Sequence, residues 1–247
     1  MIGPMRILGE LEPTKNNEKL AKRVEKLAGV VDAIDIPEAP MGKPIAHAAI
    51  LAAYIKAKYG IDAIPHVRVS DLNTVGLLSI LGGLKATGIE EAVLLKGDQP
   101  IVGKEVEELT VESAAEVASS RLGGKPRLGA MMSLRYPLEA ITKRLQAPLD
   151  FYLVLRPSHS LEKLEQVSKL AKSLNKRLYT YVIVASSRNY SKLREMLVGQ
   201  PVYNIDEAVR FVTKIQGLVD GILISSPGDV DTISETARRI KKELRLD

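Results

Sequence analysis

Residues Gly60–Pro100 read GIDAIPHVRVSDLNTVGLLSILGGLKATGIEEAVLLKGDQP, and the order of apolar and polar segments within them decides the fold. An apolar strand is followed by a polar turn, a helix, a second apolar strand and a second polar turn. Polar groups gather where the strands end, at His66, Arg68, Asp71 and Asn73 after the first and at Lys96, Gly97 and Asp98 after the second. Because β/α barrels and open α/β sheets bind ligands at the carboxyl ends of their strands, this pattern indicates an enzyme.

The same alternation continues along the chain. Strands are predicted at Met5–Leu11, Val30–Ile36, Ala63–Val69, Glu91–Lys96, Arg127–Ser133, Asp150–Arg156, Arg177–Ala185 and Gly221–Ser225. A helix is expected after each strand, with N-caps at Thr14, Asp71, Ser160, Asp206 and Asp229, and an extra helix is expected at Ser191–Leu197. No Gly/Ser/Pro-rich linker divides the 247 residues, a length that suits one barrel of about 250. We therefore predict one α/β domain over residues 1–247, a (β/α)8 TIM barrel.

The composition excludes several kinds of site and partner. The chain has no cysteine and only three histidines, so neither a disulfide nor a metal site is expected. Its net charge of +5 is spread over 35 basic and 30 acidic residues with 4% aromatics, which does not favour a nucleic-acid surface. No apolar run approaches the roughly 20 residues that cross a membrane, and the first residues show no signal-peptide pattern. We expect a cytoplasmic protein, and its high charge content would suit a thermophile.

The first strand ends in GELEPTK, which places a carboxylate near the predicted barrel mouth. Glu10 lies within the strand, where loss of water would raise its pKa and make it a proton donor near neutral pH. The alternative is an ion pair between Glu10 and a Lys or Arg of a neighbouring strand. Glu12 is expected in a solvated loop.

The second strand leads into DIPEAPMGKP, whose prolines and glycine predict a rigid loop over the mouth. Asp35 is a candidate for substrate contact, or alternatively the partner of Lys43 or Lys96. On the third strand, His66 is either a hydrogen-bonded core residue or a ligand contact. His47 falls inside a helical pattern and is expected to be structural.

The turn after the third strand leaves two readings open. Asp71 caps the next helix, with Asn73 in the first turn, or this helix start faces an anionic group at the mouth. After the fourth strand, Gly97 would let a ligand approach the backbone closely, and Asp98 could accept N–H groups of a flat heterocycle.

Further cations and a turn complete the candidate set. Arg135 and Arg156, after the fifth and sixth strands, could clamp a phosphate or carboxylate. The turn ISSPGD after the eighth strand is either an anion nest or an ordinary turn with a helix cap. His159, in a loop, could be either structural or functional.

Two segments, GIDAIPHVRVSDLN and LLSILGGLKATGIEEAVLLKGDQP, resemble the central block of the methylenetetrahydrofolate reductase family, and GELEP resembles its first-strand motif. The resemblance is specific over Asp32–Pro100. It implies an eight-stranded β/α barrel that binds FAD, in agreement with the strand count. Val154 and Leu155 stand where the family carries a Thr-Gln pair whose glutamine binds the pterin, and aromatic residues that sandwich the ligands are scarce.

The resemblance also implies roles for individual residues. Glu10 matches the general acid that opens the methylene bridge, Asp98 the aspartate near flavin and pterin, and His66 a flavin-pocket histidine; Asp71 and Asn73 match an Arg-Asp-x-Asn loop, in which Ser70 replaces the arginine. The catalytic set is then Glu10 and Asp98. Cofactor contacts are expected from His66, Arg68, Asp71, Asn73, Lys96, Gly97 and Asp98, and substrate contacts from Glu10, Asp35 and Arg156.

These residues lead to one expected function and its alternatives. We expect an FAD-dependent oxidoreductase of one-carbon metabolism that transfers hydride to the methylene carbon of a reduced pterin. Its reductant would be NAD(P)H or another donor, and a homo-oligomer or a partner subunit is possible. The alternatives are a non-redox, pterin-dependent methyltransferase subunit and a non-catalytic or partner-dependent relative.

Overall fold

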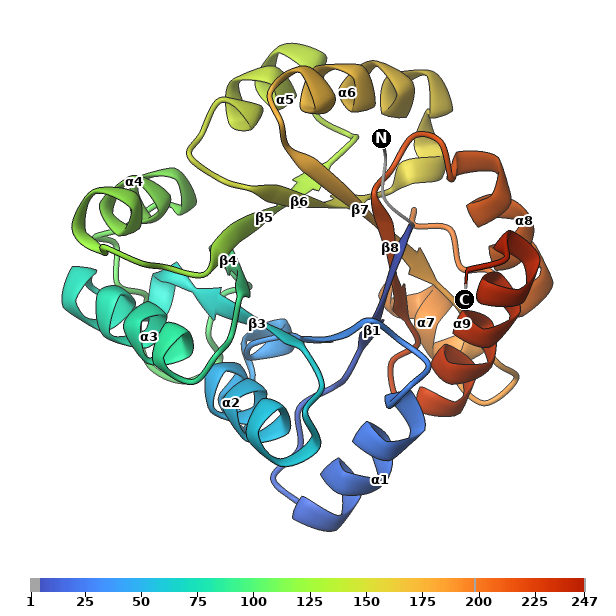
Figure 1. Ribbon diagram of the computed structural model, residues 1–247, viewed down its shortest axis with the longest axis horizontal. Coiled ribbons are helices and arrows are strands. Elements are labelled where there is room, and N and C mark those ends of the chain that lie inside the picture. Colours follow the sequence, from blue (N-terminus) through green and yellow to red (C-terminus); the bar gives the residue numbers. More distant parts are fainter. Residues whose placement is uncertain (1–4, 198, 247) are drawn as a thin grey trace.

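Eight parallel strands close into a barrel in chain order (Figure 1). The computed structural model describes residues 5–197 and 199–246. The strands are β1 (Arg6–Glu10), β2 (Ala33–Ile36), β3 (Ala63–Arg68), β4 (Glu91–Leu95), β5 (Arg127–Ser133), β6 (Phe151–Leu155), β7 (Arg177–Ile183) and β8 (Gly221–Ser225). The ring is completed by the pairing of β1 with β8. The predicted (β/α)8 TIM barrel is confirmed, and each strand lies within its predicted range.

Helices surround the strands (Figure 1). They are α1 (Asn17–Leu27), α2 (Ala48–Tyr59), α3 (Thr74–Ala86), α4 (Val111–Arg121), α5 (Leu138–Leu145), α6 (Leu161–Ser173), α7 (Tyr190–Met196), α8 (Ile205–Ile215) and α9 (Val230–Leu244), with short 3-10 turns at Pro40–Gly42, Val69–Asp71 and Pro157–His159. The extra helix predicted after the seventh strand is confirmed as α7. Within residues 5–197 and 199–246, no helix is long and apolar enough to cross a membrane.

Helix caps were predicted only in part. Ser160 and Asp229 accept the backbone N–H groups of Lys163 and Thr232, as expected. The predictions for Thr14, Asp71 and Asp206 are wrong, because an asparagine two residues away caps each of these helices: Asn16, Asn73 and Asn204. An asparagine Oδ1 in extended backbone reaches the N–H three residues on as readily as aspartate does. His47 is likewise not inside a helix but caps α2, its Nδ1 accepting the N–H of Ala49 at 3.2 Å.

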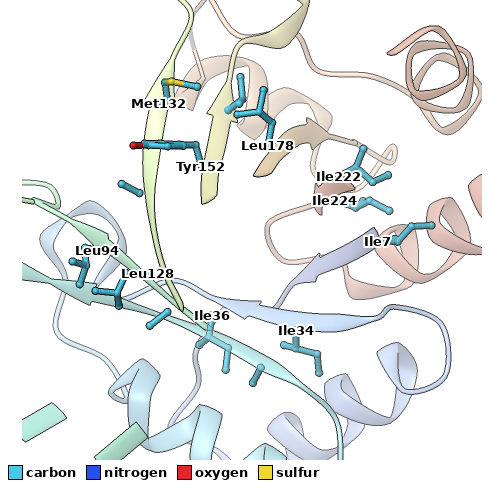
Figure 2. Packing of buried hydrophobic residues seen from close by; sticks show 14 of the residues in the cluster. Ile7, Ile34, Ile36, Leu94, Leu128, Met132, Tyr152, Leu178, Ile222 and Ile224 are labelled. Carbon is cyan, nitrogen blue, oxygen red and sulfur yellow. The ribbon is translucent and has the colours of Figure 1, made fainter. Parts of the chain in front are cut away.

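The core has two layers, because successive strand side chains point to opposite faces. Outward residues pack against the helices, and Figure 2 shows members of this layer, among them Ile7, Ile34 and Tyr152. Inward residues fill the barrel: Leu8, Ala33, Ile64, Val93, Phe151, Leu153, Tyr179 and Leu223. Gly129 makes room for the ring of Phe151, since a Cβ there would lie 2.2 Å from a ring carbon.

A charged cluster closes the amino-terminal end of the barrel. Glu91 is buried there and pairs with Arg6, with Arg127 at 3.5 Å and with Arg177 at 3.3 Å. A buried carboxylate requires such partners, because taking it out of water unpaired is costly. The inward apolar residues fill the barrel, and the Glu91 cluster closes its amino-terminal end. Polar side chains that are free to meet a ligand are therefore expected at the carboxyl-terminal mouth.

Candidate active site at the barrel mouth

Glu10 is the last residue of β1 and faces into the mouth, on the inward side of the strand with Leu8. It lies beside Asp35, its register neighbour on β2, and its Oε1 accepts a hydrogen bond from Ser225 Oγ at 2.7 Å. Burial and the charge of Asp35 raise the pKa of Glu10 to about 7, against the opposing effects of Ser225, His66 and Tyr181. The sequence alternative, an ion pair with a Lys or Arg, is not found among the described residues. Glu10 is therefore a carboxyl group that can hold a proton near neutral pH.

Asp35 and His66 form a buried pair directly beside Glu10. Both side chains are buried, with 0% and 1% exposure, and Nε2 of His66 lies 3.0 Å from Oδ1 of Asp35. Burial opposes the charged imidazole, but Asp35 and Glu10 act in the other direction and the pKa of His66 is raised. The expected alternative partners of Asp35, Lys43 and Lys96, are not its partners. The second oxygen of Asp35, Oδ2, is buried without a hydrogen-bond partner.

Tyr181 is a mouth residue that the sequence analysis missed. It points inward from β7, two residues after Tyr179, and lies near Glu10. Burial, followed by the charges of Asp35 and Glu10, raises the pKa of the Tyr181 phenol well above its usual value, so the hydroxyl keeps its proton. The alternation of the sequence LYTYVI was the available signal, because it puts both tyrosines on the inner face.

Arg68 holds together the loops that follow β2, β3 and β4. This buried guanidinium donates to Asp71 Oδ2 at 2.8 Å, to the carbonyl of Ala39 at 3.3 Å and to the carbonyl of Asp98 at 2.8 Å. Gly97 has a φ of +87°, and a Cβ on it would lie 2.8 Å from Cζ of Arg68. The backbone surface of Gly97 is therefore covered by an arginine.

Asp98 is exposed and tied to the loop after β2. Its Oδ2 accepts the N–H of Met41 at 2.9 Å, and the N–H of Ile101 donates to the carbonyl of Gly42 at 3.1 Å. Glu10 thus meets Asp35, Ser225 and Tyr181, while Asp98 meets the neighbouring loop, and no described contact joins Glu10 to Asp98.

The other predicted cofactor contacts are placed around the Arg68 loops. Asp71 binds Arg68, and Asn73 caps α3 with its Oδ1 accepting the N–H of Gly76. Lys96 is exposed and pairs with Glu105 at 3.4 Å. The roles of these residues toward a cofactor stay predictions.

A large cavity lies on the side of the mouth formed by β5 and β6. Its volume is about 1240 Å³, and its walls come from α4, α5 and the ends of both strands, including Glu112, Ile141, Arg144, Met131, Ser133, Arg135, Tyr136, Leu155 and Arg156. Met131 and Leu155 are on the inner faces of their strands, so this end of the cavity borders the barrel mouth, whereas residues 146–148, which precede β6, line its other end. Pockets for drug-sized ligands are typically about 300–1,000 Å³, so this one has room for a large cofactor.

The cavity carries two arginines at its mouth end. Arg156 adopts a left-handed backbone, with a φ of 57°, and its Nη1 donates to Ser133 Oγ at 3.4 Å. Its Nε is buried without a hydrogen-bond partner. Burial and the nearby charge of Arg135 lower the pKa of Arg156, which marks a site short of negative charge.

The turn ISSPGD is an ordinary turn with a helix cap, the second of the two alternatives for this segment. Asn189 Nδ2 donates to Ser226 Oγ and to the carbonyl of Pro227, both at 3.0 Å, and Ser186 Oγ donates to Asp229 at 2.6 Å. The hollow beside the turn has about 10 Å³, the space of one water molecule rather than a phosphate.

A flavin therefore fits one region of this mouth and not the other. At Gly97, the expected seat of a flat ring, the Arg68 guanidinium covers the backbone. Beside β5 and β6, the cavity has the volume, and the unpartnered Nε of Arg156 together with Arg135 offers cations for a diphosphate. Within the described residues, no group of three His, Asp or Glu side chains could hold a metal ion.

One family model matches the amino-terminal part of this barrel. The family model described as Methylenetetrahydrofolate reductase matches residues 12–120. The predicted family resemblance is confirmed. The match to methylenetetrahydrofolate reductase spans Asp35, His66, Arg68 and Asp98, and begins two residues after Glu10. No curated protein matches the chain.

Solved structures share the fold at low identity. An uncharacterized protein from Clostridium thermocellum, which binds two copies of 5-methyl-5,6,7,8-tetrahydrofolic acid, matches with a TM-score of 0.68 and 13% identity over 98% of this chain and 97% of that one. EDTA monooxygenase from Chelativorans sp. BNC1 matches with a TM-score of 0.67 and 11% identity over 98% and 93%. A mutant tryptophan synthase alpha-subunit from Pyrococcus furiosus reaches 0.59 and 11% over 99% and 98%. These likenesses bear on the fold alone.

Proposed function

We propose that this protein is a methylenetetrahydrofolate reductase-like oxidoreductase that reduces a methylene group on a tetrahydropterin to a methyl group. The observation that carries the proposal is Glu10, a carboxyl group at the barrel mouth with a pKa of about 7. A group that is half protonated near neutral pH is matched to proton donation in that range. The family match over residues 12–120 supports the substrate class.

The chemistry requires one proton and one hydride. The proton goes to the bridging nitrogen whose C–N bond breaks, and the hydride goes to the carbon, which becomes the methyl group. Glu10 supplies the proton, and Ser225 holds one of its oxygens in place through the 2.7 Å hydrogen bond. Tyr181 keeps its own proton and lines the mouth beside Glu10.

FAD, when bound, supplies the hydride, and NAD(P)H or another donor restores it. The cavity beside β5 and β6 is the proposed site, where Arg135 and Arg156 would bind the diphosphate and Met131 and Leu155 would contact apolar parts of the cofactor. Arg68 would have to leave Gly97 before the predicted contacts at Gly97 and Asp98 could form.

Two measurements test this proposal. Purified protein incubated with FAD and desalted should retain a flavin spectrum, and methyl-tetrahydrofolate should bleach that spectrum without oxygen. Glu10→Gln should retain the flavin but lose at least about 100-fold in turnover, the usual contribution of a general acid. Glu12→Gln, a carboxylate two residues away that pairs with Arg23, is the matched control and should remain active. Protein that takes up no flavin and turns over no pterin would contradict the proposal.

A second candidate is non-redox binding or transfer of a methyl-pterin. The specific observation in its favour is the Arg68 guanidinium on Gly97, which fills the predicted flavin seat. The Clostridium thermocellum protein of similar fold that binds 5-methyl-tetrahydrofolic acid is consistent with it. Tight binding of methyl-tetrahydrofolate by flavin-free protein would favour this candidate if the protein also retains no flavin absorbance after incubation with FAD and desalting.

A further inference from the structure

Three titratable side chains from adjacent strands share the buried floor of the mouth: Glu10 on β1, Asp35 on β2 and His66 on β3. Glu10 and Asp35 are register neighbours, and His66 Nε2 lies 3.0 Å from Asp35 Oδ1. Asp35 and His66 are essentially without solvent contact. Charges held this close and this dry act on one another strongly, because little water screens them.

The hydrogen bonds of this trio leave one acceptor over. Oδ1 of Asp35 hydrogen-bonds with His66, whereas its Oδ2 is buried without a hydrogen-bond partner. A buried carboxylate oxygen without a donor is costly, so such an oxygen is expected to have a proton directed at it. The register neighbour that can provide one is the carboxyl group of Glu10.

Charge balance leads to the same assignment. If Asp35 and His66 form an ion pair, the trio is neutral only when Glu10 carries its proton. Other charges near the trio do not replace that balance: Glu38 adds negative potential at His66, and Arg68 is occupied by Asp71. Tyr181, the titratable group facing Glu10 from β7, keeps its proton, and Ser225 from β8 is neutral.

We propose that Asp35 and His66 are a positioning pair that keeps Glu10 protonated, with Asp35 Oδ2 accepting the Glu10 proton and His66 balancing the charge of Asp35. Asp35 and His66 then act through Glu10 rather than by touching substrate. The catalytic meaning of this pair rests on the proposed function, but the protonation itself does not.

Substitutions of the two partners should shift the pKa of Glu10 in opposite directions. Asp35→Asn removes the like charge and the acceptor, so the pKa of Glu10 should fall by about one unit or more. His66→Gln removes the balancing cation and leaves Asp35 unpaired, so the pKa of Glu10 should rise by a similar amount. If the substitutions only loosened the mouth, water would enter in both variants and the pKa of Glu10 would fall in each of them.

The experiment follows the carboxyl carbons of 13C-labelled protein by NMR from pH 4 to pH 9, with the Glu10 signal assigned by its loss in Glu10→Gln. Glu12→Gln is the control and should leave the Glu10 titration unchanged. Shifts of the same sign in Asp35→Asn and His66→Gln, or shifts below about 0.3 unit, would overturn the proposal. If either variant does not fold, the 15N signals of His66 in the unmodified protein decide, because the pair requires both ring nitrogens protonated above pH 6.5.

This readout separates the pair from the enzymatic role. Opposite shifts without any pterin turnover would sustain the positioning pair and reject the proposed function. Pterin turnover with no shift in the Glu10 titration of either variant would support the proposed function and reject the positioning pair. With both intact, the upper pH limit of kcat/KM should follow the Glu10 pKa down in Asp35→Asn and up in His66→Gln.

Discussion

The guanidinium of Arg68 lies against Gly97, so close that a methyl group on the glycine would fall 2.8–2.9 Å from three of its atoms. The same guanidinium bonds Asp71, Ala39 and Asp98, which belong to three different loops. One buried arginine thus determines how the loops after β2, β3 and β4 close over this side of the mouth.

Gly97→Ala should destabilise the protein by about 2–4 kcal/mol, through a strained positive φ and displacement of Arg68. Gly103→Ala is a matched control, since Gly103 has a φ of +88° but nothing within 4 Å of a Cβ. It should show the backbone cost alone, about 1 kcal/mol. Urea unfolding measures both, and equal losses would show that the Arg68 contact adds nothing.

Arg68→Met should loosen the loop after β4 without unfolding the barrel. The carbonyls of Ala39 and Asp98 and the carboxylate of Asp71 would all lose a charged donor. Limited proteolysis should then cut faster near residues 96–105, and FAD should bind more tightly if the Gly97 surface accepts the ring. Unchanged cleavage would show that the loops hold without the arginine.

The stability of the protein should fall as the pH rises from about 5 to 8. Glu10 has a folded pKa of about 7 against 4.5 when unfolded, so the native state binds more protons in this range. The raised pKa of His66 acts with the same sign, its contribution being present below pH 6.5 and lost as the pH rises through its folded value. The Glu10 part is about 2 kcal/mol, and Glu10→Gln should remove it from urea-unfolding curves measured across this range. A slope that survives in Glu10→Gln belongs to His66, and a rise in stability with pH would contradict both assignments.

Glu91→Gln should cost about 3–5 kcal/mol, because it leaves Arg6 and two further arginines without their carboxylate at the closed end of the barrel. Glu90→Gln is the control, since Glu90 is exposed and pairs with Lys85 at 3.3 Å. It should change unfolding by less than about 1 kcal/mol. Similar losses in the two variants would mean that burial of the cluster contributes nothing.

Arg156→Ala and Arg135→Ala should each weaken FAD binding by about tenfold or more, as expected for loss of a charged hydrogen-bond donor to a phosphate. Lys143→Ala, on the α5 wall of the same cavity, serves as the comparison. Titration calorimetry measures the affinities, and equal effects of all three would indicate attraction by general positive charge rather than by the two arginines at the mouth.

The barrel was readable from sequence because each strand is a nearly continuous apolar run followed by a polar turn. Glu10, Asp35 and His66 were also identified as candidates, since each stands near the end of a strand with period-two spacing. Their mutual contact was not, because it depends on which strands are neighbours and in what register, and a single strand does not encode either.

The loops were harder to predict for a physical reason. The path after β2 depends on left-handed backbone at Ala39 and Met41, residues whose type gives no sign of it. That path brings the N–H of Met41 to Asp98, whose carboxylate is thereby bound to the loop after β2. Tyr181 escaped notice because a tyrosine in an apolar strand looks like core until the position of its hydroxyl is known.

The ring of Phe151, seated over Gly129, also shapes how molecules move through this protein. Together with Tyr179 and the other inward residues it fills the interior of the barrel, so no ligand can pass along the barrel axis. A molecule that binds over the carboxyl ends of the strands therefore cannot leave through the amino-terminal end of the barrel.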